Sequence, residues 1–280
     1  MIRFQLFRLR LFLMPTLFNQ DVDRVKILRE IISEKPSAEL RKGYWWHIGN
    51  VKEFGKNGAY FALGRTTKSI VELYNPETRD FVVDEHPESP YTHAYIDFPL
   101  QVLAIGNKPR LAQYTKSIAE HLEKLLNQQK KLQYFNMSAD IAPLNDPRDF
   151  LTHLKEAAVV GNFTAEFTLP NPFDSEEDFE KPFQKFINAS EGNKGKASVS
   201  GPDLNREVIE NIARTCAASG NDASARMKDT IKSRFRTRHL KGRAVTLDYD
   251  DEDPKESPES FLDDIRETYK AVRTEQSEND

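Results

Sequence analysis

Two runs of aromatic and apolar residues, joined by a glycine-containing turn, constrain the fold of this chain more than any other feature. Residues 45–54 and 59–64 flank Gly55-Lys56-Asn57-Gly58. Glycine and asparagine are the residues that most readily adopt the positive φ angles of short hairpin turns. The pattern therefore predicts a β-hairpin near the start of the chain.

The rest of the chain mixes strand and helix patterns without strict alternation. Apolar residues recur at helical spacing in some segments and at every second position in others. Helices are predicted at residues 21–34, 110–126, 146–158, 176–188 and 203–218, and strands at residues 80–83, 92–98, 101–105, 132–141, 162–169, 196–200 and 223–228. This order favours an α+β fold with mixed, largely antiparallel sheets and packed helices over a doubly wound parallel sheet.

The length of 280 residues suits one large domain or two of ordinary size. The polar stretch Asn127 to Lys131 marks the expected boundary between two subdomains. We therefore expect an N-terminal α+β domain at residues 1–128 and a C-terminal α+β domain with basic strands at residues 129–249. Residues 250–280 are expected to form an acidic linker and an amphipathic helix that begins at Ser257-Pro258 and must bury its apolar stripe.

The first 18 residues are apolar and superficially resemble a signal peptide. Arg3, Arg8 and Arg10 interrupt the apolar run, Pro15 breaks it, and no small-residue cleavage pattern follows. A buried opening strand is predicted instead. Since no other segment suggests a membrane span, a cytoplasmic location is expected. The single cysteine, Cys216, lies on the apolar side of a predicted helix and is interpreted as a core residue.

Charge is distributed unevenly along the chain. From Asp248 to Asp280 there are 13 acidic and four basic residues, a net charge of −9. Because the whole chain carries −4, the first 247 residues carry +5. The overall charge therefore conceals a basic body beside an acidic tail, and the acidic stretch from Asp248 to Glu256 is expected to be solvated and mobile.

Four cations in the basic body alternate with other residues, at Lys232, Arg234, Arg236 and Arg238. In a strand, this spacing places all four on one face, in a row about 20 Å long that can follow a phosphate backbone. Cations of neighbouring strands would extend the row. The predicted DNA-binding residues are Arg226, Lys228, Lys232, Arg234, Arg236, Arg238, Lys241 and Arg243. An edge strand charged to prevent aggregation is the competing interpretation.

Other motifs give little support for chemistry. The six histidines do not show metal-ligand spacing, and Gly192 to Lys196 lacks the spacing of a nucleotide-binding P-loop. No carboxylate pair followed by lysine suggests a metal-dependent nuclease, so no catalytic residue, metal or cofactor is predicted. Helix-turn-helix and zinc-finger signatures are also missing, which favours contact with the backbone of duplex DNA over sequence-specific binding.

Several segments resemble the RexA-like phage-exclusion proteins. The similarity lies in Trp46-His47-Ile48-Gly49-Asn50-Val51, in Tyr60 to Val71, in Ile141-Ala142-Pro143-Leu144, in Phe163 to Leu169 and in Ala225 to Asp229. The resemblance implies an oligomeric DNA-binding protein that senses phage replication or recombination intermediates and triggers defence through a second component, a membrane protein. It brings no catalytic residues. The acidic segment from Asp248 to Asp264 and the helix after it depart from the family pattern.

Three functional hypotheses follow. The first is a cytoplasmic anti-phage defence protein that binds duplex DNA through the basic strands as a homo-oligomer and acts with an effector protein. The second is a nuclease whose active site is assembled from residues distant in sequence. The third is a non-catalytic assembly module whose basic face meets an acidic partner, with the acidic tail of the chain itself as one candidate occupant of that face.

Overall fold

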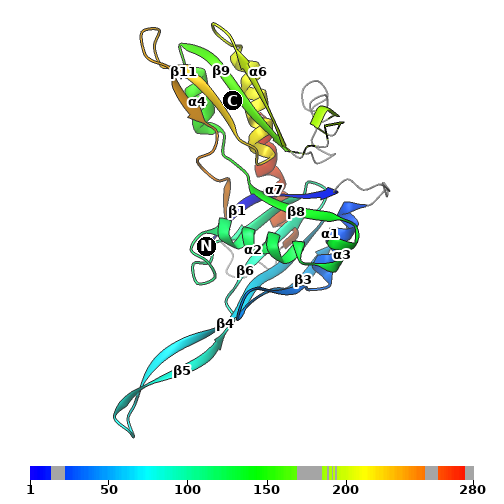
Figure 1. Ribbon diagram of the computed structural model, residues 1–280, viewed down its shortest axis with the longest axis vertical. Helices are drawn as coiled ribbons and strands as arrows, with labels where there is room; N and C mark the ends of the chain where they lie inside the picture. Colours follow the sequence, from blue (N-terminus) through cyan, green and yellow to red (C-terminus); the bar gives the residue numbers. More distant parts are fainter. Residues whose placement is uncertain are drawn as a thin grey trace.

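The computed structural model describes residues 1–13, 23–168, 185–187, 189–190, 192, 194–249 and 258–274. Two antiparallel sheets with helices packed against them form an α+β fold (Figure 1). The predicted fold class is therefore confirmed. Among the described residues, every helix is too short or too polar to cross a membrane.

The large sheet has the strand order β13-β1-β7-β6-β4-β3-β2, with β8 also paired to β1 and β5 to β4. Its strands are β1 (Ile2–Leu13), β2 (Ser37–Arg41), β3 (Tyr44–Phe54), β4 (Gly58–Asn75), β5 (Asp80–Glu88), β6 (Tyr91–Asp97), β7 (Val102–Gly106), β8 (Met137–Pro143) and β13 (Thr246–Tyr249). One face is covered by α1 (Arg24–Ser33), α2 (Thr115–Asn127) and α3 (Lys130–Tyr134). The predicted hairpin is the β3–β4 pair.

Strand β1 is an interior strand of the large sheet with three partners. It pairs with β13, β7 and β8, and its residues are buried from Leu6 to Leu11, including two arginines. Alternate side chains enter different cores: Phe4 and Leu6 face the small sheet and α7, whereas Phe7 and Leu9 face α1 and α2. The prediction of a buried opening strand is confirmed for residues 2–13, and residues 14–18 lie outside the described residues.

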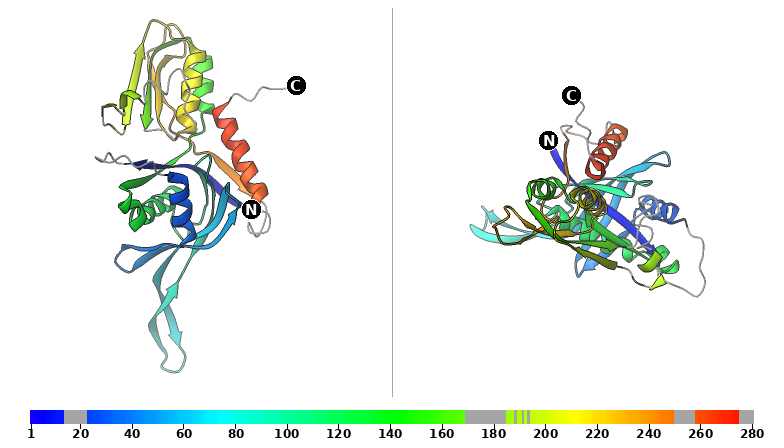
Figure 2. Two further views of the ribbon diagram at one scale, coloured as in Figure 1. Left: turned by 90° about the vertical axis from the view of Figure 1, so that its right-hand side faces the viewer. Right: turned by 90° about the horizontal axis from the view of Figure 1, so that it is seen from above.

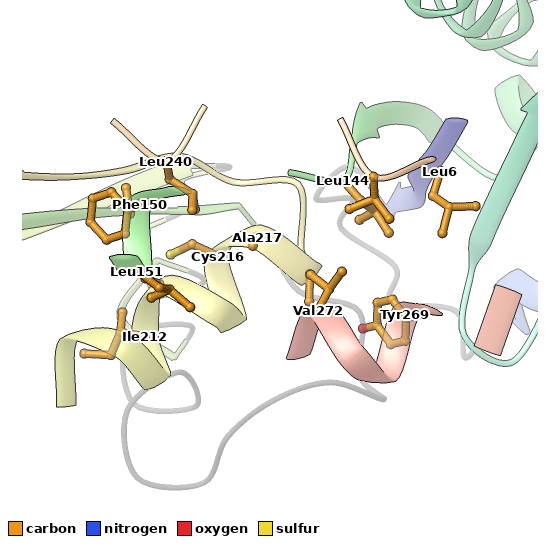
Figure 3. Packing of buried hydrophobic residues seen from close by; sticks show 14 of the residues in the cluster. Leu6, Leu144, Phe150, Leu151, Ile212, Cys216, Ala217, Leu240, Tyr269 and Val272 are labelled. Carbon is orange, nitrogen blue, oxygen red and sulfur yellow. The ribbon is translucent and has the colours of Figure 1, made fainter. Parts of the chain in front are cut away.

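The small sheet has the strand order β10-β9-β11-β12. Its strands are β9 (Val159–Thr168), β10 (Lys194–Ser200), β11 (Ala223–Lys228) and β12 (Arg236–His239). Helices α4 (Arg148–Glu156) and α6 (Arg206–Ala218) cover one face, where Phe150, Leu151, Ile212 and Cys216 pack together (Figure 3). Cys216 is thus a core residue, as predicted.

The last helix, α7 (Pro258–Arg273), joins the two sheets. It packs against α6 and against β6 and β7, and it buries the predicted stripe of Phe261, Leu262, Ile265, Tyr269 and Val272 (Figure 2). Gly58 has a φ angle that any residue can adopt, but its lack of a side chain leaves room for α7. A Cβ atom there would lie 2.6 Å from Leu262 and 2.7 Å from the carbonyl oxygen of Ile96.

Several predicted boundaries differ from the structure. The division at residue 128 does not follow the sheets, because β8 and β13 both pair with β1 of the large sheet. Residues 132–134 lie in α3, since buried Leu132 packs in the helical layer, and strand β8 begins only at Met137. Helix α2 begins at Thr115 because Tyr114 has an extended backbone. Most of the helix predicted at residues 176–188 lies outside the described residues.

Candidate nucleic-acid interface

The four alternating cations do not share one strand. Strand β12 contains only Arg236 to His239, whereas Lys232 and Arg234 lie in its connection to β11. Hydrogen bonds between Ser233 and Thr230 fold that connection into a turn. The Ser233 hydroxyl donates to the Thr230 carbonyl at 2.8 Å and accepts from the Thr230 amide at 3.1 Å. The predicted row of four cations on one strand face is therefore wrong, because a side-chain-capped turn replaces half of the strand.

The register of β11 and β12 places the remaining cations on opposite faces. Arg236 lies opposite Met227 and Arg238 opposite Ala225, so both arginines share the face that α4 and α6 cover. Arg226 lies opposite Thr237 on the other face. Arg236 and Arg238 still reach solvent because β12 is an edge strand, and both approach Asp229 at 3.9 Å.

The face away from α4 and α6 is polar, and we call it the open face. Burial alternates along β9: Phe163, Ala165 and Phe167 are buried, and the residues between them are partly exposed. The open face consists of Asn162, Thr164, Glu166, Thr168, Lys194, Lys196, Ser198, Ser200, Ser224, Arg226, Lys228, Thr237 and His239. No helix of the described residues packs on it.

Hydrogen bonds order the middle of the open face. The Asn162 amide donates to the hydroxyls of Ser198 and Ser200 at 3.1 and 2.9 Å, and Thr164 and Ser198 share a hydrogen bond of 3.0 Å. These groups are partly or fully exposed, so they remain accessible to a ligand. Hydroxyl and amide groups of this kind commonly contact phosphate oxygens.

At one end of the open face, an aromatic ring carries two cations. The Arg226 guanidinium lies 5.4 Å and the Lys228 ammonium 4.8 Å from the centre of the Phe235 ring. No carboxylate of the described residues pairs with either cation. The ring lies against Gly161 of β9, where a Cβ atom would lie 2.8 Å from Phe235. A β-bulge between Arg226 and Met227 interrupts the pairing of β11 with β9 beside it. The sequence pattern did not identify Phe235, because the contact of its ring with Gly161 joins residues that are far apart in the chain.

At the other end, a cleft of about 560 Å³ separates the two sheets. Its basic residues come from four elements or their ends: Arg10 of β1, Lys116 of α2, Lys194 and Lys196 of β10, and Lys241 after β12. Arg10 pairs with Asp140 at 2.9 Å and Lys196 with Glu166 at 2.7 Å. Lys194 has no ion-pair partner among the described residues.

Lys196 and Glu166 stabilise each other's charged form. The hydrogen bond from Lys196 lowers the pKa of the Glu166 carboxyl, and the same bond raises the pKa of the Lys196 ammonium. Both groups are consequently charged at neutral pH. The cleft lining carries five basic and two acidic side chains and remains positive.

Asn221 connects the two walls of the cleft. Its side-chain oxygen accepts from Arg10 at 3.2 Å and from the Thr168 hydroxyl at 2.7 Å, so one buried amide links β1 to β9. Its backbone carbonyl accepts from Asn145 at 3.3 Å. Gly220, with a φ of 67°, precedes it because a Cβ atom there would lie 2.9 Å from Ala142. The cleft is therefore part of the fold and not a gap between loosely joined units.

The predicted binding residues thus fall into four groups. Arg226, Lys228 and Lys241 belong to the open face or the cleft, Lys232 and Arg234 lie in the exposed loop next to Phe235, and Arg236 and Arg238 lie on the other face. Arg243 pairs with Asp149 of α4 at 3.2 Å and so lies away from the open face. Lys194 and Lys196 are not among the predicted binding residues, although their alternation in a basic segment is visible in the sequence.

The acidic tail is partly ordered and lies elsewhere. Asp248 belongs to β13 and pairs with Arg3 at 2.8 Å, so the expectation of a mobile segment is wrong for its first two residues. Helix α7 packs on α6, which covers the opposite side of the small sheet from the open face. Residues 250–257, which carry most of the acidic run, lie outside the described residues.

No group of three or more histidine, cysteine or carboxylate side chains among the described residues could hold a metal ion. No protein-family model matches the chain, and no curated protein matches it by sequence.

Proposed function

We propose that this protein binds nucleic acid, mainly duplex DNA, through the open face and the adjoining cleft. The observation that carries this proposal is a polar sheet face with cations at both ends: Lys194, Lys196 and Lys241 near the cleft, and Arg226 and Lys228 at the Phe235 ring. From Thr168 to Asn162 the face is about 20 Å long. One strand of duplex DNA carries about six phosphates over that length.

Backbone contact is the mode that suits this chemistry. The serine, threonine and asparagine groups between the cations hydrogen-bond phosphate and sugar oxygens, and such contacts position a duplex without reading its sequence. Residues 194–249 carry twelve basic and six acidic side chains, which supports electrostatic attraction toward this part of the molecule. Affinity should therefore fall steeply with salt and depend little on DNA sequence.

A mobility-shift titration tests the proposal. Two double variants remove the cations at the two ends of the face separately: Arg226→Glu/Lys228→Glu and Lys194→Glu/Lys196→Glu. Each variant should weaken DNA binding at least about tenfold at low salt. Lys42→Glu/Lys52→Glu is the matched control, because both lysines are exposed on the large sheet. Unchanged affinity in both folded variants would exclude the open face. A similar loss in the control would indicate a dependence on net charge alone.

We further propose that binding serves anti-phage defence, in the cytoplasm and together with an effector protein. This part depends on the resemblance to RexA-like proteins. Phage plaque counts on cells that express the protein, with and without a candidate membrane effector protein, test the role. Equal plaque counts for the wild type, the open-face variants and an empty vector would contradict it.

A further inference from the structure

Strands β4 and β5 extend beyond the large sheet as a two-stranded arm (Figures 1 and 2). We define the arm as residues 67–88, where β5 pairs only with β4, from Thr67 opposite Glu88 to Asn75 opposite Asp80. Nine paired positions give a length of about 30 Å. An isolated two-stranded hairpin is marginally stable in water, so an arm of this length is expected to gain stability from a partner surface.

The tip of the arm exposes apolar side chains on both faces. Phe81 is 80% exposed and Val83 68% exposed, and they share one face with Tyr74; Leu73 and Val82 lie on the other face. The turn is well defined, because the Asn75 side chain accepts from the amides of Glu77 and Thr78 at 2.9 and 3.4 Å. A structured tip with contiguous exposed apolar residues indicates an interaction site.

The charge of the arm limits what it can bind. The arm contains six acidic residues against Lys68 and Arg79, a net charge of −4. Strand β5 carries four of these acids together with Pro87, which disfavours the addition of another strand along its edge. Two arms placed against each other would also bring like charges together. The partner surface should therefore be basic and partly apolar.

The chain presents such a surface at the opposite end of the molecule. We define the basic hairpin as residues 226–238, with six cations and one acid, Asp229, a net charge of +5. Its connection also exposes Ile231, at 77%, and Phe235. Figure 1 shows the arm and the β11 end of the small sheet at opposite ends of the longest axis.

We propose that the arm of one copy docks on the basic hairpin of a second copy. The two surfaces differ, so the contact is heterologous and propagates head to tail into a ring or an open chain. This inference does not depend on nucleic-acid binding. Because Arg226 and Lys228 belong both to the basic hairpin and to the open face, an arm and a nucleic acid cannot occupy them together.

Sedimentation velocity on two complementary full-length variants tests the proposal. The arm variant is Tyr74→Ser/Phe81→Ser/Val83→Ser, and the hairpin variant is Ile231→Ser/Arg234→Glu/Arg236→Glu. Each should weaken self-association at least about thirtyfold, because central aromatic and arginine side chains dominate interface energies. An equimolar mixture should recover a 1:1 dimer and nothing larger, since only one arm and one hairpin remain intact in the pair.

The mixture distinguishes this contact from its alternatives. A mixture that stays monomeric while the wild type assembles would overturn the proposal in favour of a symmetric or different interface. A wild type that is monomeric at every concentration tested would also overturn it. Circular dichroism establishes that each variant is folded. DNA binding by the arm variant, measured in parallel, should be retained or tightened, which separates a failure of this contact from a failure of the proposed function.

Discussion

The Arg8 guanidinium donates a hydrogen bond to the Tyr269 hydroxyl at 3.2 Å and lies 5.5 Å from the centre of the same ring. The contact joins the first strand to the last helix, and both side chains are almost fully buried. Arg8 also donates to the carbonyl of Leu100 at 2.6 Å. Helix α7 is therefore held to the large sheet by a polar contact within an apolar interface.

Tyr269→Phe should destabilise the protein by about 1–3 kcal/mol. The substitution preserves the ring but removes the acceptor for a buried charged donor, which costs more than an exposed hydrogen bond. The free energy of unfolding from urea titration measures the effect. Tyr134→Phe is the control, because that ring is 80% exposed and its loss of a hydroxyl should change stability by less than about 0.5 kcal/mol.

Gly161→Ala should disturb the end of the open face. The new Cβ atom would meet the Phe235 ring at 2.8 Å, so the ring must move, and the positions of Arg226 and Lys228 change with it. We expect a stability loss of about 1–3 kcal/mol and weaker DNA binding at low salt. Gly49→Ala is the matched control, since nothing lies within 4 Å of its added Cβ. Equal behaviour of the two variants would show that the position of Phe235 does not depend on the absence of a side chain at residue 161.

Local patterns predicted much of the secondary structure because they depend on nearby residues. The β3–β4 hairpin, the opening strand and α7 follow directly from apolar spacing and turn residues. The last helix also shows the limit of such reasoning. Gly58 is required where α7 crosses β4, and this contact with Leu262 involves residues that are far apart in the chain.

The prediction of one strand from the alternation of Lys232, Arg234, Arg236 and Arg238 is wrong for a related reason. Exposed polar residues can alternate in a loop as easily as in a strand, because no burial fixes their backbone conformation. The pairing of β12 with β11 then decided which cations share a face, and a shift of one residue would reverse the result. Lys196 joins the site only because β10 pairs with β9, a long-range contact that a single sequence does not reveal.

Glu123→Gln should stabilise the protein at neutral pH. Burial raises the pKa of the Glu123 carboxyl, although its oxygen accepts from the Ile141 amide at 2.7 Å. Folding therefore favours the protonated form of the Glu123 carboxyl. The stabilisation of the fold by this form is complete below the pKa of about 4.3 that the carboxyl has in the unfolded chain, and it is lost as pH rises through the higher pKa of the folded protein. Glutamine keeps an acceptor oxygen and carries no charge.

Thermal unfolding of the wild type and Glu123→Gln from pH 4 to pH 8 measures this difference. The gain of the variant should be largest at neutral pH and should shrink toward the acidic end. Glu267→Gln, at an exposed position of α7, is the control and should show no such trend. A constant difference between Glu123→Gln and the wild type over the whole range would contradict the assignment to ionisation.

Asn221→Ala should loosen the connection between the two sheets. The Thr168 hydroxyl loses the Asn221 side-chain oxygen that accepts its hydrogen bond at 2.7 Å. Arg10 loses the same acceptor but keeps its ion pair with Asp140. Removing an acceptor shared by two buried or half-buried donors should cost about 2–4 kcal/mol. Asn211→Ala, on the exposed side of α6, provides the comparison. Because the cleft takes Arg10 and Lys116 from the side of the large sheet and its other basic residues from the side of the small sheet, DNA affinity should also fall in Asn221→Ala at temperatures where the variant remains folded, as measured by mobility shift beside circular dichroism.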